Sequence, residues 1–151
     1  MTVAERATEK IVVAAAPEIC YAVAADFERY GEWASDIKEV RILSHDEQGR
    51  PQRVHYRAAA FGRSITYTLS YDYSEAPKAL SWVQIEGDLT SKLDGRYSFE
   101  PTTEGDTEVS YNLEVELKLP IPGFVKRRAE ARVISTALRA LKARAESQAR
   151  A

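Results

Sequence analysis

The chain has 151 residues, 44% of them hydrophobic and only one a cysteine, so it is about one domain long and can bury a core without disulfides or metals. We expect residues 1–151 to form a single cytoplasmic domain, because Cys20 cannot form an internal disulfide and no charged, apolar leader opens the sequence. The longest apolar runs have only a few residues, far fewer than the roughly 20 of a membrane-spanning helix, which predicts a soluble protein.

The net charge of −2 hides an uneven distribution. Residues 123–151 hold eight Lys or Arg against two Glu, a balance of +6, which leaves 13 basic against 21 acidic residues, or −8, in residues 1–122. One interpretation is a solvated helix face beside the acidic residues 1–122. The other is peripheral contact with an anionic membrane or an acidic carrier protein through Lys126 and the arginines after it. The acidic body argues against nucleic acid as a partner, and the sequence favours no oligomeric state.

The first part of the chain predicts one strand followed by two short helices. Residues 8–15 have the composition of a strand, and Pro17 suits the first turn of a helix that continues to residue 25. Residues 26–33 resemble a second short helix interrupted by a glycine. Their three aromatic residues recur at helical spacing, which predicts that these side chains pack inward.

Alternation of apolar and polar residues marks much of the chain from there to residue 119. Alternation places apolar side chains on one face of a strand, which is typical of an antiparallel sheet with one buried face. The connections are short and rich in turn residues, so consecutive strands should be antiparallel neighbours in a meander. Together with residues 8–15, this predicts seven strands, the other six being residues 40–44, 53–60, 64–74, 80–86, 92–100 and 109–119.

A long basic helix is predicted over residues 123–151. Pro120 and Pro122 end the last strand, because proline cannot donate to a ladder, and Pro122 is suited to open the helix. One helix covers a curved sheet incompletely, so we expect an apolar space between the two. The predicted sheet-facing row is Val125, Ala129, Val133, Ala137 and Leu141, flanked by Ile134 and Leu138.

The sequence offers little support for a catalytic or metal centre. It has no Cys or His cluster, no phosphate-binding glycine loop, no nucleophile elbow and no dinucleotide fingerprint, which argues against metals and cofactors. His45 lies in a turn, His55 lies on the outward phase of its strand, and Cys20 suits a small core position. For Arg96 a surface position is favoured over contact with a guest. No catalytic residue is predicted, since the neighbouring carboxylates lie on the polar phase of their strands.

Aromatic residues dominate the inward phase of the predicted strands. A buried phenol or indole needs a hydrogen-bond partner, so these side chains either satisfy one another in a core or bind the polar end of a ligand. Ligand sites are commonly apolar cavities with a few such polar groups. The predicted ligand-binding residues are Trp33, Tyr56, Tyr67, Tyr71, Trp82, Gln84, Tyr97, Phe99, Tyr111, Val133, Ala137, Leu138 and Leu141.

Several short motifs occur, once each, in a characteristic order along residues 7–147. They are Ala16 with Pro17, Asp26 to Trp33, Gly49 with Arg50, Tyr71 followed by Pro77 and Trp82, Gly95 with Tyr97, Thr107 with Val109 and Tyr111, and Pro120 with Pro122, Gly123 and Phe124. In order and spacing they resemble the helix-grip fold of the START-like superfamily, also called SRPBCC. Within it the chain is most similar to the polyketide cyclase/dehydrase and lipid-transport group, which includes coenzyme Q-binding-type members.

The resemblance implies an α+β fold in which a seven-stranded antiparallel sheet wraps around a long C-terminal helix, with two short helices after the first strand. Proteins of this superfamily bind lipids, sterols, quinones, polyketides or plant hormones between sheet and helix, and some cyclise or aromatise polyketides. We therefore expect the chain to bind or carry a hydrophobic small molecule, with the Phe61–Gly62 hairpin and residues 120–124 as its entrance.

Two alternatives remain beside that expectation. The first is a polyketide aromatase or cyclase. The clearest cyclases place an arginine or a histidine inward, whereas neither is predicted to face inward here, which favours a non-catalytic binder. The second is a membrane-surface or partner-binding module that uses the basic C-terminal helix.

Overall fold

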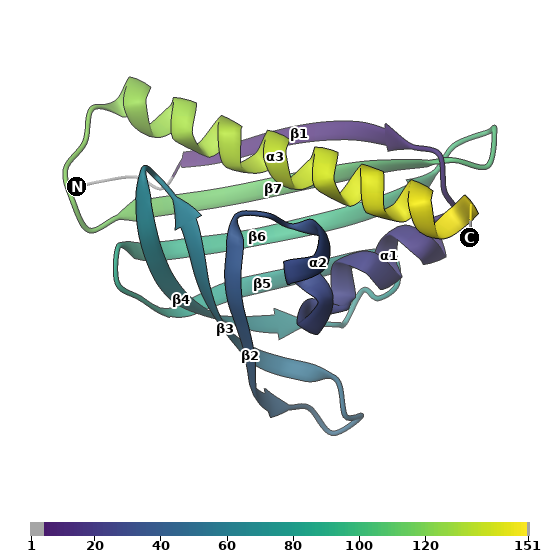
Figure 1. The fold of residues 1–151 in the computed structure, drawn as a ribbon, viewed down its shortest axis with the longest axis horizontal. Helices are drawn as coiled ribbons and strands as arrows, with labels where there is room; N and C mark the ends of the chain where they lie inside the picture. The colour runs from purple at the N-terminus through teal and green to yellow at the C-terminus, as the bar shows by residue number, and fades with distance from the viewer. Residues whose placement is uncertain (1–4, 151) are drawn as a thin grey trace.

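The fold is built on one seven-stranded antiparallel sheet, as the alternation predicts. The computed structural model describes residues 5–150, and its strands follow the order β1-β7-β6-β5-β4-β3-β2 (Figure 1). Strands β2 to β7 form a meander, and β1 pairs with β7 at the far edge. The strands are β1 (Glu5–Val13), β2 (Ile37–His45), β3 (Pro51–Ala60), β4 (Arg63–Asp72), β5 (Ala79–Gly87), β6 (Thr90–Pro101) and β7 (Thr107–Leu117).

Three strands, β1, β4 and β7, end two residues earlier than predicted, β4 at Asp72. In β1 and β7, backbone groups turn to partners outside the ladder. β1 ends at Val13, where the next amide, that of Ala14, donates to the Glu146 carboxylate at 2.8 Å. β7 ends at residue 117 rather than 119, where the Lys118 amide donates to the carbonyl of Leu89 in the β5–β6 turn at 2.8 Å. Both ends are therefore fixed by contacts between distant segments, which alternation does not encode.

The helices are α1 (Pro17–Ala25), a single 3-10 turn η1 (Phe27–Arg29), α2 (Tyr30–Trp33) and α3 (Gly123–Arg150). The predicted second short helix is thus split into η1 and α2. Pro122 precedes α3 and accepts the amides of Val125 and Lys126 at 3.0 and 3.1 Å, so its carbonyl caps the helix. Within residues 5–150, no helix combines the length and the apolar character that crossing a bilayer requires.

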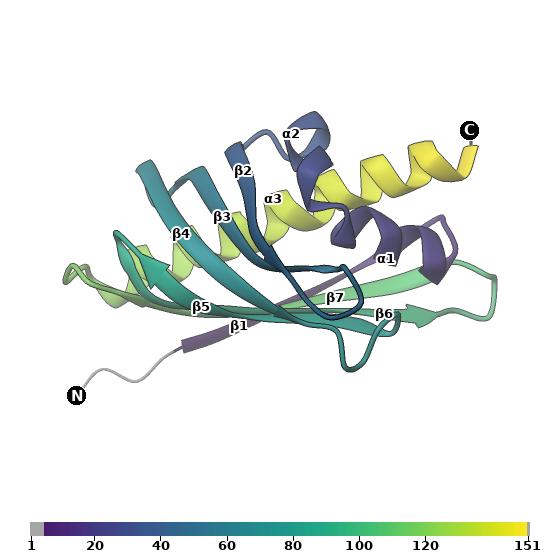
Figure 2. The same ribbon diagram turned by 90° about the horizontal axis from the view of Figure 1, so that it is seen from below.

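All helices lie on one side of the sheet. β2, β3 and β4 curl toward that side, so the sheet grips α3 as the helix-grip fold predicts (Figure 2). α3 packs mainly on β1, β7 and α1. The inner faces of β3, β4 and β5 therefore depend on other side chains for cover, and the candidate site lies there.

The buried stripe of α3 is turned slightly from the predicted row. Ile134 and Leu138, expected as flanking residues, are buried at the centre of the contact, whereas Val125 is exposed and Val133 is half-buried. The fully or nearly fully buried residues of α3 are Glu130, Ile134, Leu138, Leu141 and Ala145. Apart from Glu130, the buried residues of α3 lie after residue 133, and several residues before it line open space.

Glu130 explains why the apolar pattern missed this stripe. Its side chain is buried, and its carboxylate lies 3.4 Å from Lys126 Nζ one turn earlier. A pattern based on hydrophobicity assigns a carboxylate to solvent, because a buried charge is costly unless it is paired. Here an ion pair within the helix satisfies that condition.

Candidate functional site

An aromatic chamber lies between the inner face of the sheet and the helices. Its volume is about 100 Å³. Seven of the predicted site residues line it, namely Tyr56, Tyr67, Tyr71, Trp82, Tyr97, Tyr111 and Val133. The remaining lining comes from Tyr30, Ala60, Phe61, Ile65, Leu69 and Leu93.

The chamber wall follows from strand alternation and from register. On β4, Ile65, Tyr67, Leu69 and Tyr71 are spaced by two residues, so all four point to the inner face. Cross-strand partners then bring rings together: Tyr56 is opposite Tyr67, and their ring centroids are 5.3 Å apart. The wall is a continuous aromatic surface rather than a set of isolated rings.

Gly95 makes room for the largest ring of this wall. Trp82 is the register partner of Gly95, and its indole lies over the glycine. A Cβ at position 95 would lie 2.3 Å from a ring carbon of Trp82, far inside van der Waals contact. The glycine is therefore needed for the indole to reach Tyr97 and Tyr111, whose centroids lie 5.5 and 5.8 Å from that of Trp82.

The hydrogen-bonding groups of the chamber divide into two sets. The Tyr56 and Tyr71 hydroxyls are 2.6 Å apart, and the Tyr30 hydroxyl donates to the Ala24 carbonyl. The second set has no hydrogen-bond partner among residues 5–150, and it comprises the hydroxyls of Tyr67, Tyr97 and Tyr111 and the indole N–H of Trp82. A polar group on an apolar wall is costly unless something pairs with it. None of these four groups is a fully buried polar atom, so all four are donors that face open space.

Burial keeps every phenol of the chamber protonated. It raises the pKa of Tyr67 and Tyr97 above the usual value of 10.0, and it raises the pKa of Tyr111 well above that value. Burial likewise raises the pKa of Tyr30, Tyr56 and Tyr71. The chamber lining contains no carboxylate, imidazole, amine or guanidinium. At neutral pH its polar groups can donate hydrogen bonds, but none of them is a ready general base.

A larger hollow, which we call the vestibule, adjoins the chamber. Its volume is about 770 Å³, and it lies between the β3–β4 hairpin and the first half of α3. Ala60, Phe61 and Val133 line both spaces, so they form the junction between them. Phe61 has a φ of 55° and Gly62 a φ of 76°, the left-handed pair of a tight hairpin turn. The vestibule lies where the sequence predicted an entrance, and residue 121 also lines it.

Three predicted site residues from the strands and short helices lie outside the chamber lining. Trp33 packs edge-on against Tyr30, at 5.0 Å between centroids, and borders a separate surface hollow with Arg144. Gln84 holds the β5–β6 turn: its amide nitrogen donates to the Thr90 carbonyl at 2.8 Å. Phe99 is buried and stacks on Tyr97, at 6.1 Å between centroids, without lining the chamber.

The predicted helix residues other than Val133 also lie outside the chamber lining. Leu138 and Leu141 are buried in the core, and Ala137 is half-buried beside it. This follows from the turned stripe of α3, which places Ile134 and Leu138 at the centre of the packed face. Ligand contact by these residues, as by the seven that line the chamber, stays a prediction.

Six lining residues were missing from the predicted site, and most of them carried a usable signal. Ile65 and Leu69 share the phase of Tyr67 and Tyr71, and Leu93 shares the phase of Tyr97, so alternation alone could have found them. Tyr30, Ala60 and Phe61 are harder to find. They belong to a short helix and a hairpin end, whose positions depend on the curl of the sheet.

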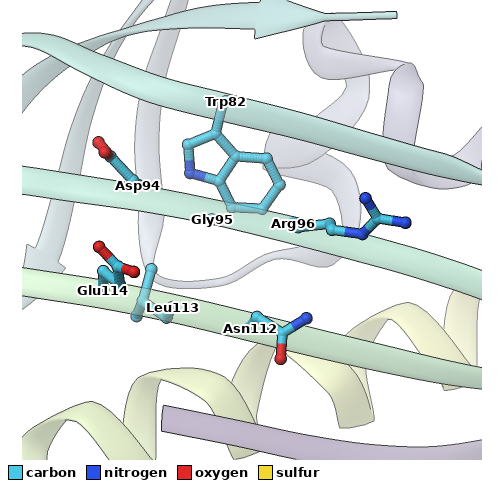
Figure 3. Close-up of a pocket in the computed structure, with 7 residues that line it drawn as sticks. All are labelled: Trp82, Asp94, Gly95, Arg96, Asn112, Leu113 and Glu114. Atoms are coloured by element: carbon cyan, nitrogen blue, oxygen red, sulfur yellow. The ribbon is translucent and has the colours of Figure 1, made fainter. Parts of the chain in front are cut away.

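A further hollow, of about 300 Å³, lies at the sheet where β5 and β6 separate after the Trp82–Gly95 pair (Figure 3). Its charged groups are engaged with neighbouring residues outside the hollow. Glu114 pairs with Lys92 at 2.9 Å, and Asp94 accepts the backbone amide of Gln84. Arg96 pairs with Glu75, in line with the predicted surface position. We assign this hollow a structural role.

Comparisons with known proteins agree with this architecture. Residues 4–146 match a family described as polyketide cyclase/dehydrase and lipid transport. A START superfamily protein from Mycobacterium smegmatis is 27% identical with a TM-score of 0.89, over 95% of this chain and 98% of that chain. The Zhui aromatase/cyclase from Streptomyces sp. R1128 is 16% identical with a TM-score of 0.83, over 95% and 94%.

One half of a larger protein is also similar. The di-domain aromatase/cyclase StfQ from the steffimycin pathway is 21% identical with a TM-score of 0.74, over 99% of this chain and 53% of that chain. A comparison with curated proteins gives no match. The structural likenesses confirm the START-like, helix-grip fold expected from the sequence.

Proposed function

Because the chain belongs to the polyketide cyclase/dehydrase and lipid transport family, we propose that it binds or carries a hydrophobic small molecule, such as a lipid, a quinone or a polyketide, in the chamber and the vestibule. One observation carries the proposal. The hydroxyls of Tyr67, Tyr97 and Tyr111, three residues that line an apolar chamber, have no protein partner among residues 5–150. A guest with carbonyl or quinone oxygens would satisfy them.

The two volumes suggest how such a guest lies. Binding sites for small molecules usually measure about 300–1,000 Å³, whereas the chamber measures about 100 Å³ and the vestibule about 770 Å³. The chamber suits a small, uncharged, acceptor-bearing end, because its lining has donors and no charge. The apolar bulk of the guest would lie in the vestibule, and its burial at roughly 25 cal/mol per Å² would supply most of the affinity.

The test is uptake of a lipophilic fluorescent probe in vesicle-free solution, together with native mass spectrometry of freshly purified protein. Val133→Trp should block the junction between vestibule and chamber and reduce uptake. Arg139→Trp, an exposed position of α3 outside both linings, is the matched control and should bind normally. Equal uptake by the two variants and the parent protein would count against the site.

A polyketide aromatase or cyclase is the second candidate, favoured by the same unpartnered phenols. Neutral hydroxyl donors can stabilise charge that develops on a ketone oxygen, and a confining chamber can fold a flexible chain into a reactive shape. The lack of a base in the lining makes a carrier the better-supported function. Incubation with a minimal polyketide synthase tests this candidate: a product mixture identical to the spontaneous one would remove cyclisation of that substrate.

A further inference from the structure

The outer border of the vestibule concentrates exposed apolar side chains. Eight large hydrophobic residues are exposed among residues 7–150, and four of them lie within residues 119–125, between β7 and the first turn of α3. Phe124 is 60% exposed, Leu119 45%, Val125 41% and Ile121 36%. Scattered exposed apolar residues need no explanation, but a cluster of them marks a surface that a partner covers.

We call residues 119–125 the apolar segment. Figure 1 shows it at the start of α3, and two of its members, Ile121 and Val125, line the vestibule. The Val125 amide donates to the Pro122 carbonyl at 3.0 Å, which fixes the first helical turn. Phe124 is therefore held outward on an ordered element, and its exposure is a property of the fold.

Three exposed arginines line the same vestibule. Arg63 comes from the β3–β4 hairpin, and Arg128 and Arg132 come from α3 on the other side. None of the three has an ion-pair partner within residues 5–150, and Asp36 is the one carboxylate of the vestibule lining. Cations thus face outward on both sides of an apolar opening.

Lys126 does not belong to this set, which corrects the expectation drawn from the run of basic residues. Its side chain is only 12% exposed, because it extends along the helix toward the buried carboxylate of Glu130. The charge pattern of the linear sequence therefore overstated the accessible charge on α3 and missed Arg63 on the opposite border.

We propose that this opening docks on the surface of an anionic lipid bilayer. The apolar segment enters the boundary between headgroups and acyl chains, and Arg63, Arg128 and Arg132 bind lipid phosphates beside it. Phenylalanine with aliphatic residues at the boundary and arginines at the phosphate level is the arrangement of interfacial membrane anchors. The vestibule then faces the bilayer, so a hydrophobic guest enters without crossing water; only this last step rests on the proposed function.

A bilayer fits these observations better than an acidic protein does. Arginines alone would suit either partner. A side chain as exposed as Phe124 requires a complementary pocket on a protein, whereas a bilayer accepts it without one. Apolar and cationic groups also line the same vestibule, which matches a fluid surface with phosphates above an apolar layer.

Co-sedimentation with vesicles tests the proposal, using neutral phosphatidylcholine with and without phosphatidylserine. The protein should bind the anionic vesicles, and binding should fall with salt. Replacing the three arginines together by glutamine should weaken binding on the order of a hundredfold, since each basic residue near such a surface contributes roughly a factor of five. The matched control replaces Arg41, Arg53 and Arg139 by glutamine, which are exposed positions away from the vestibule and should bind like the parent. Circular dichroism confirms that both triple variants are folded.

Insertion is tested separately with tryptophan reporters. Emission from Phe124→Trp should shift to shorter wavelength on anionic vesicles, whereas emission from Ile85→Trp, an exposed apolar position on β5, should not. Absence of vesicle binding at low salt overturns the proposal, as does equal binding by the two triple variants. Binding to a purified acidic carrier protein without binding to vesicles also overturns it and identifies a protein partner. Because probe uptake is measured without vesicles, failure here is distinct from failure of the proposed function.

Discussion

The two halves of α3 rest on the same sheet and differ in what they do there. After residue 133, Ile134, Leu138, Leu141 and Ala145 are buried against β1, β7 and α1. Before it, α3 presents small, half-buried or exposed side chains to the vestibule. One helix therefore stabilises the fold with its second half and borders the vestibule with its first. Variants that separate the two roles test this division.

The largest stability effect is expected in the packed half. Leu141→Ala removes a fully buried side chain, so the free energy of unfolding should fall by about 2–5 kcal/mol, through lost burial and the cavity left behind. Urea denaturation measures it. Val125→Ala in the vestibule half is the control, and its effect should stay within about 0.5 kcal/mol. Similar losses for both variants would show that the two halves are not energetically distinct.

The next effect is expected inside the chamber wall. Gly95→Ala places a methyl group 2.3 Å from the Trp82 ring, so the indole must move. We expect a loss of about 1–3 kcal/mol and an altered near-ultraviolet circular dichroism spectrum. Gly31→Ala is the control, since a Cβ there meets nothing within 4 Å.

A double variant checks the physical cause. Trp82→Leu should remove most of the additional cost of Gly95→Ala, because the two residues are in direct contact and their effects should not add. Additive losses would mean that the alanine acts through the backbone and not through the indole. In that case Gly95 would have no part in shaping the chamber.

The chamber also shows what the sequence could and could not predict. Alternation identified the inner face of β3 to β7, so Tyr56, Tyr67 and Trp82 were predicted together. Alternation shows which residues of a strand point inward, but it does not show which part of the inner face is packed and which part is open. Leu138 and Leu141 share the inward side of α3 with Val133, yet of the three only Val133 lines the chamber.

Residues placed by contacts other than strand pairing could not be found from the alternation. Phe61 reaches the chamber because a left-handed hairpin turn and the curl of β3 and β4 carry it under α3. Glu130 is buried because Lys126 pairs with it. Gln84 has the inward phase but is held by Thr90 in a turn. In none of these cases does strand alternation encode the contact, even though Lys126 lies one helical turn from Glu130 and Thr90 lies six residues from Gln84.

Within the chamber, removing a tyrosine hydroxyl should affect different properties. Loss of a paired hydroxyl should lower the free energy of unfolding, whereas loss of an unpartnered one should lower probe affinity. Tyr56→Phe breaks the 2.6 Å bond to Tyr71 and should cost about 1 kcal/mol of unfolding free energy. Tyr97→Phe breaks no bond within residues 5–150, so stability should change by less than about 0.5 kcal/mol, while affinity for a ketone- or quinone-bearing probe falls. If Tyr97→Phe destabilised the protein and left probe affinity intact, its hydroxyl would be structural.

The smallest effect is expected at the far end of the packed half, where α3 is tied to the end of β1. The Glu146 carboxylate accepts hydrogen bonds from Lys142 Nζ at 2.7 Å and from the Ala14 amide at 2.8 Å. These bonds, with that to Lys142 first, lower the pKa of Glu146 below the usual 4.5. A lowered pKa in the folded state contributes stability that is present above pH 4.5 and lost as the pH falls through the folded value.

Glu146→Gln should therefore reduce the free energy of unfolding at neutral pH by less than about 1 kcal/mol, because the ion pair is partly solvated. The deficit should shrink as the pH falls below 4.5, where the parent loses the same interaction. Urea titrations of both proteins across this range measure it, with the exposed Glu47→Gln as the control. A deficit that is constant with pH would mean that glutamine perturbs packing rather than charge. It would then be the shape of the packed half, and not its ion pair, that holds the end of β1 against α3.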